Sequence, residues 1–343
     1  MAELTLEDIA KQVGVSRSTV SRVVNGSPNV SAKVRSKVLD AIQKTGYHPN
    51  AAARSLASQR TRMIGLVVPN SVNTFFNDPF FPKLIQGIAF GCNNHDLSLS
   101  LFLIGNKEDE EKILPRISQS GMLDGVLIQS EFPGDPLVDY LTASKIPSVM
   151  LGRPKGQNEI SYVDVDNFDA AAKATQHLID LGYQRIATIT GKKGNAVTDD
   201  RLNGYLKALN ESGRSANNSL IATGDFTEVG GYSAMKTIQK AKPDAVFITS
   251  DLMAVGAIRY LQAINLRVPE DVAIVGFDDV LHESMIKIPL TTIRQPIKKM
   301  GVKAVELLIE LIEKGKNPAR HCVLETELII RDSCGAKVKQ PAL

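Results

Sequence analysis

From residue 63 onward the chain alternates short apolar runs with longer amphipathic segments. The apolar runs have the length of strands and are MIGLVV, LSLSLFLI, GVLIQ, IPSVML, YVDVD, RIATIT, DAVFITS and VAIVGF. Apolar residues recur at helical spacing in the segments between them, near 80–95, 107–120, 135–144, 168–181, 198–212, 229–241 and 251–263. Strands that alternate with helices form parallel sheets with helical crossovers. The pattern predicts an α/β body built from doubly wound parallel sheets.

These units are too many for one sheet, and the pattern restarts near Ser161, which predicts two similar lobes. A helix near 296–314 and a strand over VLETELII at 323–330 are expected to return across the lobe boundary. The expected limits are about 63–160 and 292–320 for the N-lobe, and about 161–291 and 321–335 for the C-lobe. Ligands bind at the carboxyl ends of strands in open α/β sheets, so a cleft between the lobes is the expected small-molecule site.

Residues 1–46 have a different pattern, with three short helical segments separated by turn residues. Thr5 and Asp8 have the spacing of a capping box, and Ser16 and Ser31 stand where they can cap the second and third helices. The turn around Gly14 is about four residues long, the length that a helix-turn-helix requires. We expect a small all-α domain here.

The N-terminal part of the chain, here called the head, differs from the rest of the chain in charge. The first 62 residues carry ten Lys and Arg against four Asp and Glu, a net charge of +6, within a chain whose formal net charge is +3. The remainder is therefore mildly acidic. A basic head on an acidic body indicates a polyanionic partner for the head alone.

Residues 47–62, YHPNAAARSLASQRTR, join the two parts. They contain a proline, small residues and three arginines, but too little apolar surface for a core. We interpret them as a linker that folds conditionally, because so short an isolated helix is marginal in water.

The sequence disfavours several other classes of protein. Cys92, Cys322 and Cys334 are widely spaced and have no zinc-ligand pattern. The acidic N-terminus is unlike a secretory signal, and no run approaches the roughly 20 apolar residues of a membrane helix. We therefore expect a cytoplasmic protein without a membrane contact.

Enzyme motifs are also missing. The GKKGN loop lacks the spacing of a phosphate-binding P-loop, and neither G-x-G-x-x-G nor G-x-S-x-G occurs after a strand. Strand ends that carry Asp164, Asp166, Asp278 and Asp279 suggest a metal site only weakly, because Asp commonly caps helices there. We predict no cofactor, no metal and no catalytic residue.

The segment TLEDIAKQVGVSRSTVSRVVNGSPNVSAKVRSKVLDAIQKTGYHPNAAARSLAS closely resembles the DNA-binding head of the lactose and galactose repressor family. The body is similar to that family as well, with RLNGY at 201–205, SDLMAVGA at 250–257, VGFDD at 275–279 and TTIRQP at 291–296 in the expected order. The resemblance covers nearly the whole chain. It implies a helix-turn-helix domain over 1–46, a hinge helix over 47–62 and an effector-binding and dimerisation domain of periplasmic-binding-protein type over 63–343.

By this resemblance the second helix of the head enters the major groove of double-stranded operator DNA. Arg17, Ser18 and Arg22 point outward from it, and Arg22 can make a bidentate contact to guanine. Thr19, Ser21, Asn25 and Ser31 are assigned to phosphate oxygens, which position the head, and Thr5 and Ser16 are also expected to bind DNA. In the hinge, Asn50, Ala53 and Leu56 are assigned to DNA, with Leu56 as a wedge in the minor groove.

The resemblance also implies an effector site in the cleft. Its aromatic candidates are Phe80 or Phe81, of which we favour Phe80, and Phe226; they can stack on a sugar ring. The long loop PNSVNTFFNDPFFPKL supplies the first two. The polar candidates are Arg153, Arg201 and Asp251, with Arg201 and Asp251 expected on opposite walls of the cleft.

We therefore predict a homodimeric regulator of carbohydrate metabolism genes, a repressor controlled allosterically by a small sugar such as a glucoside or a maltose-like sugar. Control by a phosphorylated carrier protein is the alternative, and a sugar-metabolising enzyme is the rival outside regulation. The sign of the effector's action stays open. The tail after Ile330 has no leucine heptad, which predicts no tetramer helix.

Overall fold

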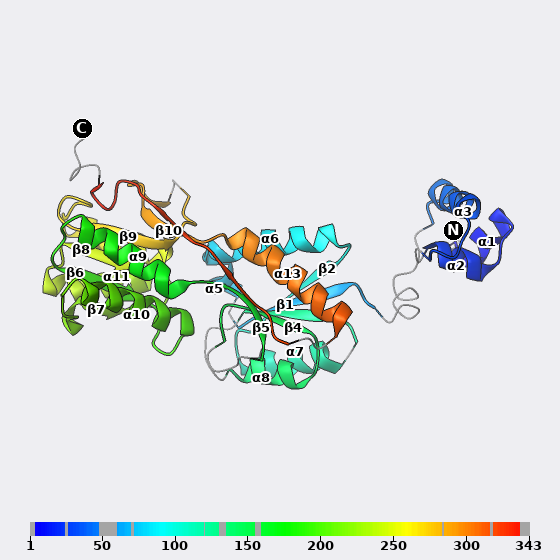
Figure 1. Cartoon of the computed structure of the whole chain (residues 1–343), viewed down its shortest axis with the longest axis horizontal. Coiled ribbons are helices and arrows are strands. Elements are labelled where there is room, and N and C mark those ends of the chain that lie inside the picture. Colours follow the sequence, from blue (N-terminus) through cyan, green and yellow to red (C-terminus); the bar gives the residue numbers. More distant parts are fainter. Residues whose placement is uncertain are drawn as a thin grey trace. The chain divides into compact units, whose positions relative to one another are not determined.

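The computed structural model describes residues 4–24, 27–47, 60–69, 72–119, 121–129, 135–154, 159–282, 285–315 and 318–336. The chain divides into two compact units, Met1–Arg62 and Met63–Leu343. Figure 1 shows the helices of the first unit and the sheets of the second. Among the described residues, no helix is both long enough and apolar enough to cross a bilayer.

The described part of the first unit contains α1 (Leu6–Val13), α2 (Arg17–Val24) and α3 (Ala32–Thr45). Side chains from all three helices form one small core, which includes Ile9, Val20, Val23, Val38 and Tyr47. The core-facing residues of each helix recur three or four positions apart, so the apolar stripe faces inward and the opposite face stays in water.

Local capping sets the helix limits in this unit. Thr5 and Asp8 form a reciprocal capping box at the start of α1, which confirms that prediction. Gly14 follows α1 with a φ of 74°, a left-handed conformation that favours glycine. Oγ of Ser16 accepts from the backbone N–H of Thr19 at 3.2 Å. Ser31 precedes α3 without a side-chain capping bond, so the expected cap at Ser31 is wrong.

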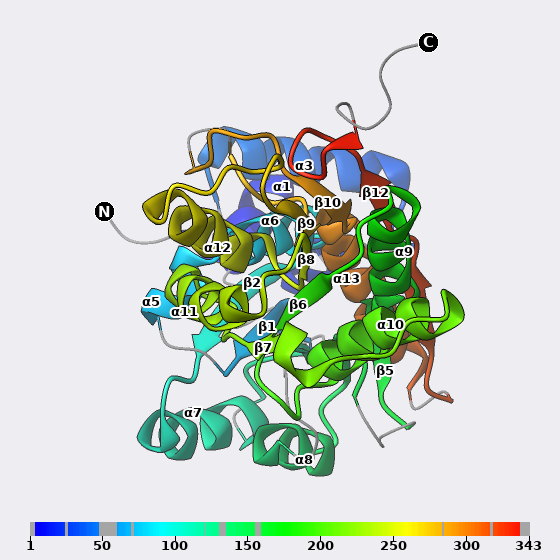
Figure 2. The same cartoon turned by 90° about the vertical axis from the view of Figure 1, so that its left-hand side faces the viewer.

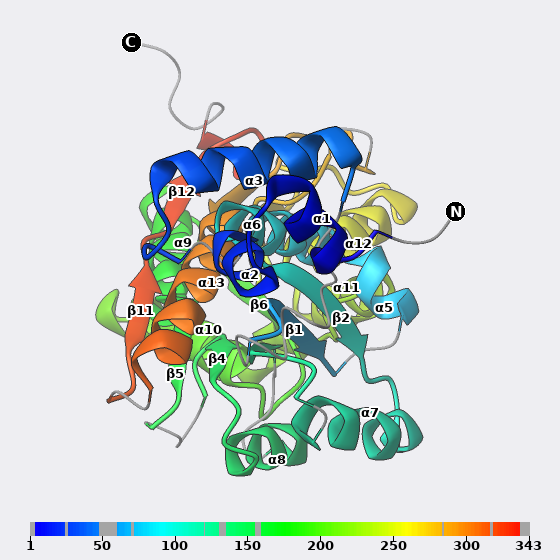
Figure 3. The ribbon, with the colours of Figure 1, turned by 90° about the vertical axis from the view of Figure 1, so that its right-hand side faces the viewer.

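The first sheet of the second unit has the order β11-β5-β4-β3-β1-β2, and all of its neighbouring strands are parallel. Its strands are β1 (Met63–Val68), β2 (Ser98–Leu103), β3 (Gly125–Gln129), β4 (Ser148–Leu151), β5 (Ser161–Val165) and β11 (His321–Leu324). Helices α6 (Phe80–Asn94) and α13 (Ile297–Lys314) pack on one face, and α7 (Lys107–Gln119) and α8 (Pro136–Ala143) pack on the other (Figure 3).

The second sheet repeats this arrangement with the order β12-β10-β9-β8-β6-β7. Its strands are β6 (Ile186–Thr190), β7 (Ile221–Thr223), β8 (Ala245–Ile248), β9 (Ala273–Asp278), β10 (Thr291–Arg294) and β12 (Glu327–Ile329). Only the edge pair β10–β12 is antiparallel among the described strands. Helices α9 (Asn167–Asp180) and α10 (Ala196–Glu211) cover one face, and α11 (Glu228–Ile238) and α12 (Asp251–Ala263) cover the other (Figure 2).

The lobe limits differ from those expected. β5 belongs to the first sheet although a boundary at Ser161 was expected, because it pairs in parallel with β4. Conversely, β10 belongs to the second sheet, where it pairs with β9. The run 323–330 is two short strands in different sheets, β11 beside β5 and β12 beside β10. The chain thus crosses between lobes after β5, after β10 and between β11 and β12 (Figure 1).

The loop expected after β1 contains a short helix, α5 (Val72–Asn77). Phe75 from this helix is fully buried and stacks on Phe81 with ring centroids 4.6 Å apart. The aromatic residues of this segment are therefore divided between the core of the first lobe and the surface beside it.

Candidate functional site

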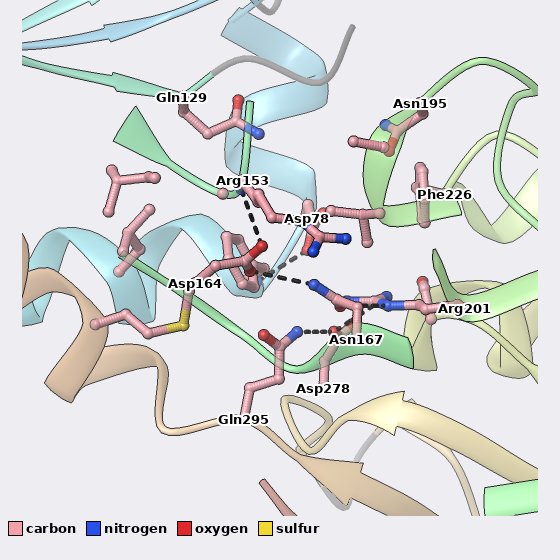
Figure 4. Close-up of a pocket in the computed structure, with 18 of the residues that line it drawn as sticks. Asp78, Gln129, Arg153, Asp164, Asn167, Asn195, Arg201, Phe226, Asp278 and Gln295 are labelled. Carbon is pink, nitrogen blue, oxygen red and sulfur yellow. Dashed lines mark hydrogen bonds and ion pairs between the residues drawn. The ribbon is translucent and has the colours of Figure 1, made fainter. Parts of the chain in front are cut away.

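A cavity lies where residues of both lobes meet, and its empty volume of about 870 Å³ is partly open to solvent. The first lobe supplies Asp78, Phe80, Phe81, Leu84, Gln129, Leu151, Gly152, Arg153, Asp164 and Met300. The second lobe and the crossovers supply Asn167, Asn195, Ala196, Val197, Arg201, Phe226, Ser250, Asp278 and Gln295. Figure 4 shows the polar side chains converging on the middle of the cleft.

Arg201, on the second turn of α10, is the most tightly held cation of the described cleft. Its side chain is almost fully buried, and its Nε donates to Oδ1 of Asn167 at 2.9 Å. Nη1 donates to the carbonyl oxygen of Thr249 at 2.5 Å and lies 3.8 Å from Oδ1 of Asp278. The guanidinium also covers the ring of Phe277, 3.6 Å from its centroid. Burial lowers the pKa of Arg201, and the nearby carboxylates oppose that shift.

Two buried carboxyl groups lie at strand ends around this guanidinium. Asp278 ends β9 and accepts a hydrogen bond from Nε2 of Gln295 at 2.6 Å. Asp164, in β5, accepts from the backbone N–H groups of Arg153 and Val165 and from Nδ2 of Asn167. Burial raises the pKa of Asp278 and of Asp164 to about 6 each, while Arg201 acts in the opposite direction on both.

The aromatic candidates border the cavity on both sides. Phe80 is half-buried and meets Phe81 edge to face, with ring centroids 5.6 Å apart. Phe81 is 4% exposed and packs mainly in the first core. Phe226 borders the cavity from the second lobe, in the segment after β7, and has a φ of 64°. Phe80 and Phe226 therefore offer the more accessible ring surfaces.

Arg153 connects the lobes at the edge of the cavity. Its backbone N–H donates to Asp164 at 2.9 Å, and its guanidinium forms an ion pair with Asp200 of α10. The side chain is thus engaged with the opposite lobe, although the residue was expected to reach an effector directly.

The expectation for Asp251 requires correction. This carboxyl group is 1% exposed and does not border the cavity. Oδ1 accepts from Oγ1 of Thr292 at 2.6 Å, and Oδ2 accepts from the backbone N–H of Val280 at 3.0 Å. Arg201 and Asp251 also belong to the same lobe, so they are not on opposite walls. Burial raises the pKa of Asp251 to about 8.

The carboxylate that faces the cavity from the second lobe is Asp278, which the sequence interpretation missed as a ligand contact. The sequence signal was present, because Asp278 ends the apolar run VAIVGF and begins the DD pair of VGFDD. Asp164, Asn167, Gln295 and Gln129 were missed as well. Gln129 ends β3, and its Oε1 is buried with no hydrogen-bond partner in the part of the chain that the structure describes.

The head presents its candidate DNA contacts on α2. Arg17, Ser18 and Arg22 are exposed. A hydroxyl cluster marks the start of the helix, where Oγ of Ser16 lies 2.8 Å from both Oγ of Ser18 and Oγ1 of Thr19.

Other head candidates have more varied settings. Thr5 is engaged in the α1 cap, Ser21 is half-buried and Ser31 is exposed. Asn25, Asn50, Ala53 and Leu56 lie outside the described residues, as does most of the expected hinge. The described residues contain no group of three or more His, Cys, Asp or Glu placed to hold a metal ion.

Comparisons with known proteins agree with this organisation. Residues 5–50 match "Bacterial regulatory proteins, lacI family", and residues 175–334 match "Periplasmic binding protein-like domain". The chain is 39% identical over 333 residues to the HTH-type transcriptional regulator CelR of Thermobifida fusca, covering 96% of this chain and 98% of that protein.

Solved structures extend the similarity to three dimensions. A transcriptional regulator CelR–cellobiose complex has a TM-score of 0.77 at 37% identity and covers 96% of this chain and 99% of its own. The lac repressor dimer bound to operator and the anti-inducer ONPF has a TM-score of 0.82 at 27% identity, with 97% and 99% covered. Because a regulator of this family matches the chain over nearly its whole length, the chain belongs to the lacI family of bacterial regulatory proteins and is a DNA-binding transcriptional regulator.

Proposed function

We propose that this protein represses genes of carbohydrate metabolism and that a small sugar in the cleft controls its binding to operator DNA. The observation that carries the proposal is the cleft's chemistry, in which hydrogen-bonding groups from both lobes surround a space bordered by Phe80 and Phe226. A sugar has a polar rim of hydroxyls and apolar ring faces. Such a ligand needs charged or amide partners at its rim and aromatic surfaces on its faces.

The individual partners fit sugar hydroxyls. Asp278 and Asp164 are acceptors at the cavity, and Gln129 offers a buried oxygen with no partner in the described structure. Arg201 is fixed by three contacts within the second lobe, so its orientation beside the cavity is set before a ligand binds. Polar groups that are oriented before binding give up little entropy when the ligand arrives.

Cellobiose is the first sugar to test, because a solved relative at 37% identity is a complex with that disaccharide. An effector that releases DNA must bind more weakly to the DNA-bound form, because the two binding equilibria are linked reciprocally. An effector that strengthens DNA binding obeys the same linkage with the opposite sign.

For the head, we propose that Arg17, Ser18 and Arg22 read base edges and that the hydroxyls of Ser16 and Thr19 contact phosphates. The exposure of all three readers on one short helix supports this assignment. We further propose that Asn25, Asn50, Ala53 and Leu56 complete the DNA contact, with Leu56 in the minor groove. The regulator would act in the cytoplasm, where bacterial DNA is found.

We propose a homodimer whose two heads bind adjacent half-sites of a near-palindromic operator. A solved relative is a lac repressor dimer on operator DNA. Exposed apolar side chains on both lobes, among them Phe90 on α6 and Val229 on α11, offer surface for such a contact. Sedimentation of the purified chain at micromolar concentration should give a dimer.

The proposal is tested with an operator selected from random duplexes by the purified full-length chain. Fluorescence anisotropy would measure operator binding across a salt series, and calorimetry would measure cellobiose and maltose binding. We expect affinity for DNA to fall steeply with salt through counterion release, and one sugar to shift the operator affinity. A protein that binds operator but responds to no sugar in the panel would refute sugar control and leave the DNA-binding function standing.

A further inference from the structure

The cleft has an unbalanced set of charges around its cavity. The described lining carries the carboxyl groups of Asp78, Asp164 and Asp278 against the guanidiniums of Arg153 and Arg201. Asp164 and Asp278 are both buried, so water screens them poorly. A ligand that enters the cleft therefore meets carboxylates from both lobes.

The cations near the cavity that the structure describes already have partners. Arg201 donates to Asn167 and to the carbonyl of Thr249, and Arg153 pairs with Asp200. Lys83, whose charge lowers the pKa of Asp278, donates through Nζ to the carbonyl oxygen of Asp279 at 2.7 Å. An incoming anion would have to compete with these partners for each positive charge.

Other sources of positive potential are partly engaged or lie outside the lining. The first turn of α10 borders the cavity, and Oδ1 of Asn195 accepts from one of its backbone N–H groups, that of Thr198, at 3.1 Å. Lys192 and Lys193 precede this helix with exposed side chains and are not part of the lining. The side chain of Asp279 is held by Arg294 and Arg331, so those two arginines are engaged as well.

We propose that this cleft selects an uncharged sugar and rejects its phosphorylated, sulfated or acidic counterparts, with Asp164 and Asp278 as the residues that determine this specificity. The inference rests on the proposed sugar effector and narrows it to a chemical class. The physical reason is that the described lining of the cleft offers several hydroxyl acceptors, while each of its two guanidiniums already has a protein partner.

The expected discrimination is large. At an effective dielectric constant of about 20, a negative charge about 6 Å from a buried carboxylate is repelled enough to weaken binding roughly a hundredfold. The wild-type chain should therefore bind cellobiose at least a hundredfold more tightly than its 6′-sulfate. A sulfate is the suitable anion because it stays fully ionised throughout the pH range used below.

The experiment separates charge from bulk with a third ligand. Calorimetry on the full-length chain at pH 8 compares cellobiose, its 6′-sulfate and its 6′-methylsulfonate ester, a neutral group of nearly the same size as the sulfate. We expect the neutral ester to bind within about tenfold of cellobiose and the sulfate to be rejected. Rejection of both esters would show that size sets the limit, which would overturn the inference.

Two variants test the residues themselves. Asp164→Asn and Asp278→Asn should each lower the ratio of cellobiose to sulfate affinity at least tenfold, because each removes one negative charge from the cavity. Asp166→Asn is the matched control. Asp166 is exposed, caps α9 and stands two residues from Asp164 without bordering the cavity, so the same charge change should leave the ratio unaltered.

The pH dependence gives a test without substitutions. The pKa values of Asp164 and Asp278 lie at about 6, so both groups are charged at pH 8 and largely protonated at pH 5. Asp251 lies behind Asp278, and burial raises its pKa to about 8, while the positive charges that act on the two cavity carboxyl groups are those of Arg153, Arg201 and Lys83. Discrimination against the sulfate should therefore shrink at least tenfold as the pH falls from 8 to 5.

The outcomes distinguish the two proposals. If neither cellobiose nor maltose binds, sugar control fails and this selectivity fails with it. If cellobiose binds and its sulfate binds within threefold of it at pH 8, sugar control stands and the selectivity is refuted. If the ratio of cellobiose to sulfate affinity were unchanged in both Asp variants and at pH 5, the assignment of the selectivity to Asp164 and Asp278 would also be refuted.

Discussion

The head and the cleft use polar side chains in opposite ways. On α2 of the head, Arg17, Ser18 and Arg22 stand exposed, whereas Arg201 in the cleft is 5% exposed and held by the residues around it. A DNA duplex is large and brings its own charge to an exposed surface. A small ligand must instead find its partners already oriented, because it has few contacts with which to order them.

The difference in burial decides how a single substitution acts. Removing an exposed reader changes only the interaction with the partner. Removing a buried charge also leaves its neighbours unpaired, so stability and binding change together. Three predictions test this comparison, from the largest expected effect to the smallest.

Arg201→Ala should have the largest effect. It leaves Asp278 buried without its guanidinium, so we expect a loss of roughly 3–5 kcal/mol in stability of the body and at least a hundredfold weaker effector binding. Denaturant unfolding of the full-length chain and calorimetry measure the two losses. The head lies in the other compact unit, so operator binding should persist without a response to effector.

Lys112→Met is the control for that experiment. Lys112 forms an exposed ion pair with Glu108 on α7, 2.6 Å apart, and exposed pairs contribute little to stability. We expect no measurable change in unfolding or in effector affinity. If Arg201→Ala and Lys112→Met changed stability and effector affinity equally, the proposed difference between buried and exposed charges would be wrong.

Arg22→Ala should act on specificity alone. A bidentate arginine contact to guanine discriminates by about 1–3 kcal/mol, so this variant should lose preference at one base pair of each half-site. Lys33→Ala, on the exposed surface of α3, should weaken all sequences alike and reduce the salt dependence. Competition among operator variants distinguishes the two. Unchanged sequence ratios in Arg22→Ala would disprove base reading by that residue.

Thr5→Ala should have the smallest effect, a loss of about 1 kcal/mol in stability of the head through the α1 cap. The Thr5 hydroxyl and backbone N–H hold the pKa of Asp8 below its ordinary value, so the cap's contribution is present above pH 4 and is lost as the pH falls further. Thermal unfolding followed by circular dichroism at pH 7 and pH 3 measures both effects.

Ser31→Ala is the control for the cap. Ser31 occupies the same position before α3 but makes no side-chain capping bond, so its loss should leave the unfolding curve unchanged. If both serine and threonine variants destabilise the head equally, hydrogen bonding in the capping box is not the cause.

Much of the head and of the strand pattern could be predicted because the signals are local. Thr5 and Asp8 cap α1 through residues three positions apart, and the run MIGLVV is β1 over its full length. Such features depend on backbone propensity and on the periodicity of apolar residues. The sequence likewise indicated the family, since the resemblance extends through the head and into the body.

The cleft could be predicted only in part. Arg201 and Phe226 border it, but Asp251 and Asp278 follow similar apolar strands, and only one of them faces the cavity. Sequence spacing places both carboxyl groups at strand ends. It does not show that Thr292 and Val280 bind Asp251 from within the lobe.

The limits of the two lobes were predicted wrongly for the same reason, because they depend on contacts between residues far apart in the chain. β5 joins the first sheet by pairing with β4, and β11 joins it by pairing with β5, from which about 160 residues separate it. The helical head, the alternation of strands and helices and the family could all be recognised from the order of the residues. Which strand ends meet, and which carboxyl groups remain open to a ligand, became evident only in the folded chain, because those outcomes depend on pairing and burial between residues far apart in the sequence.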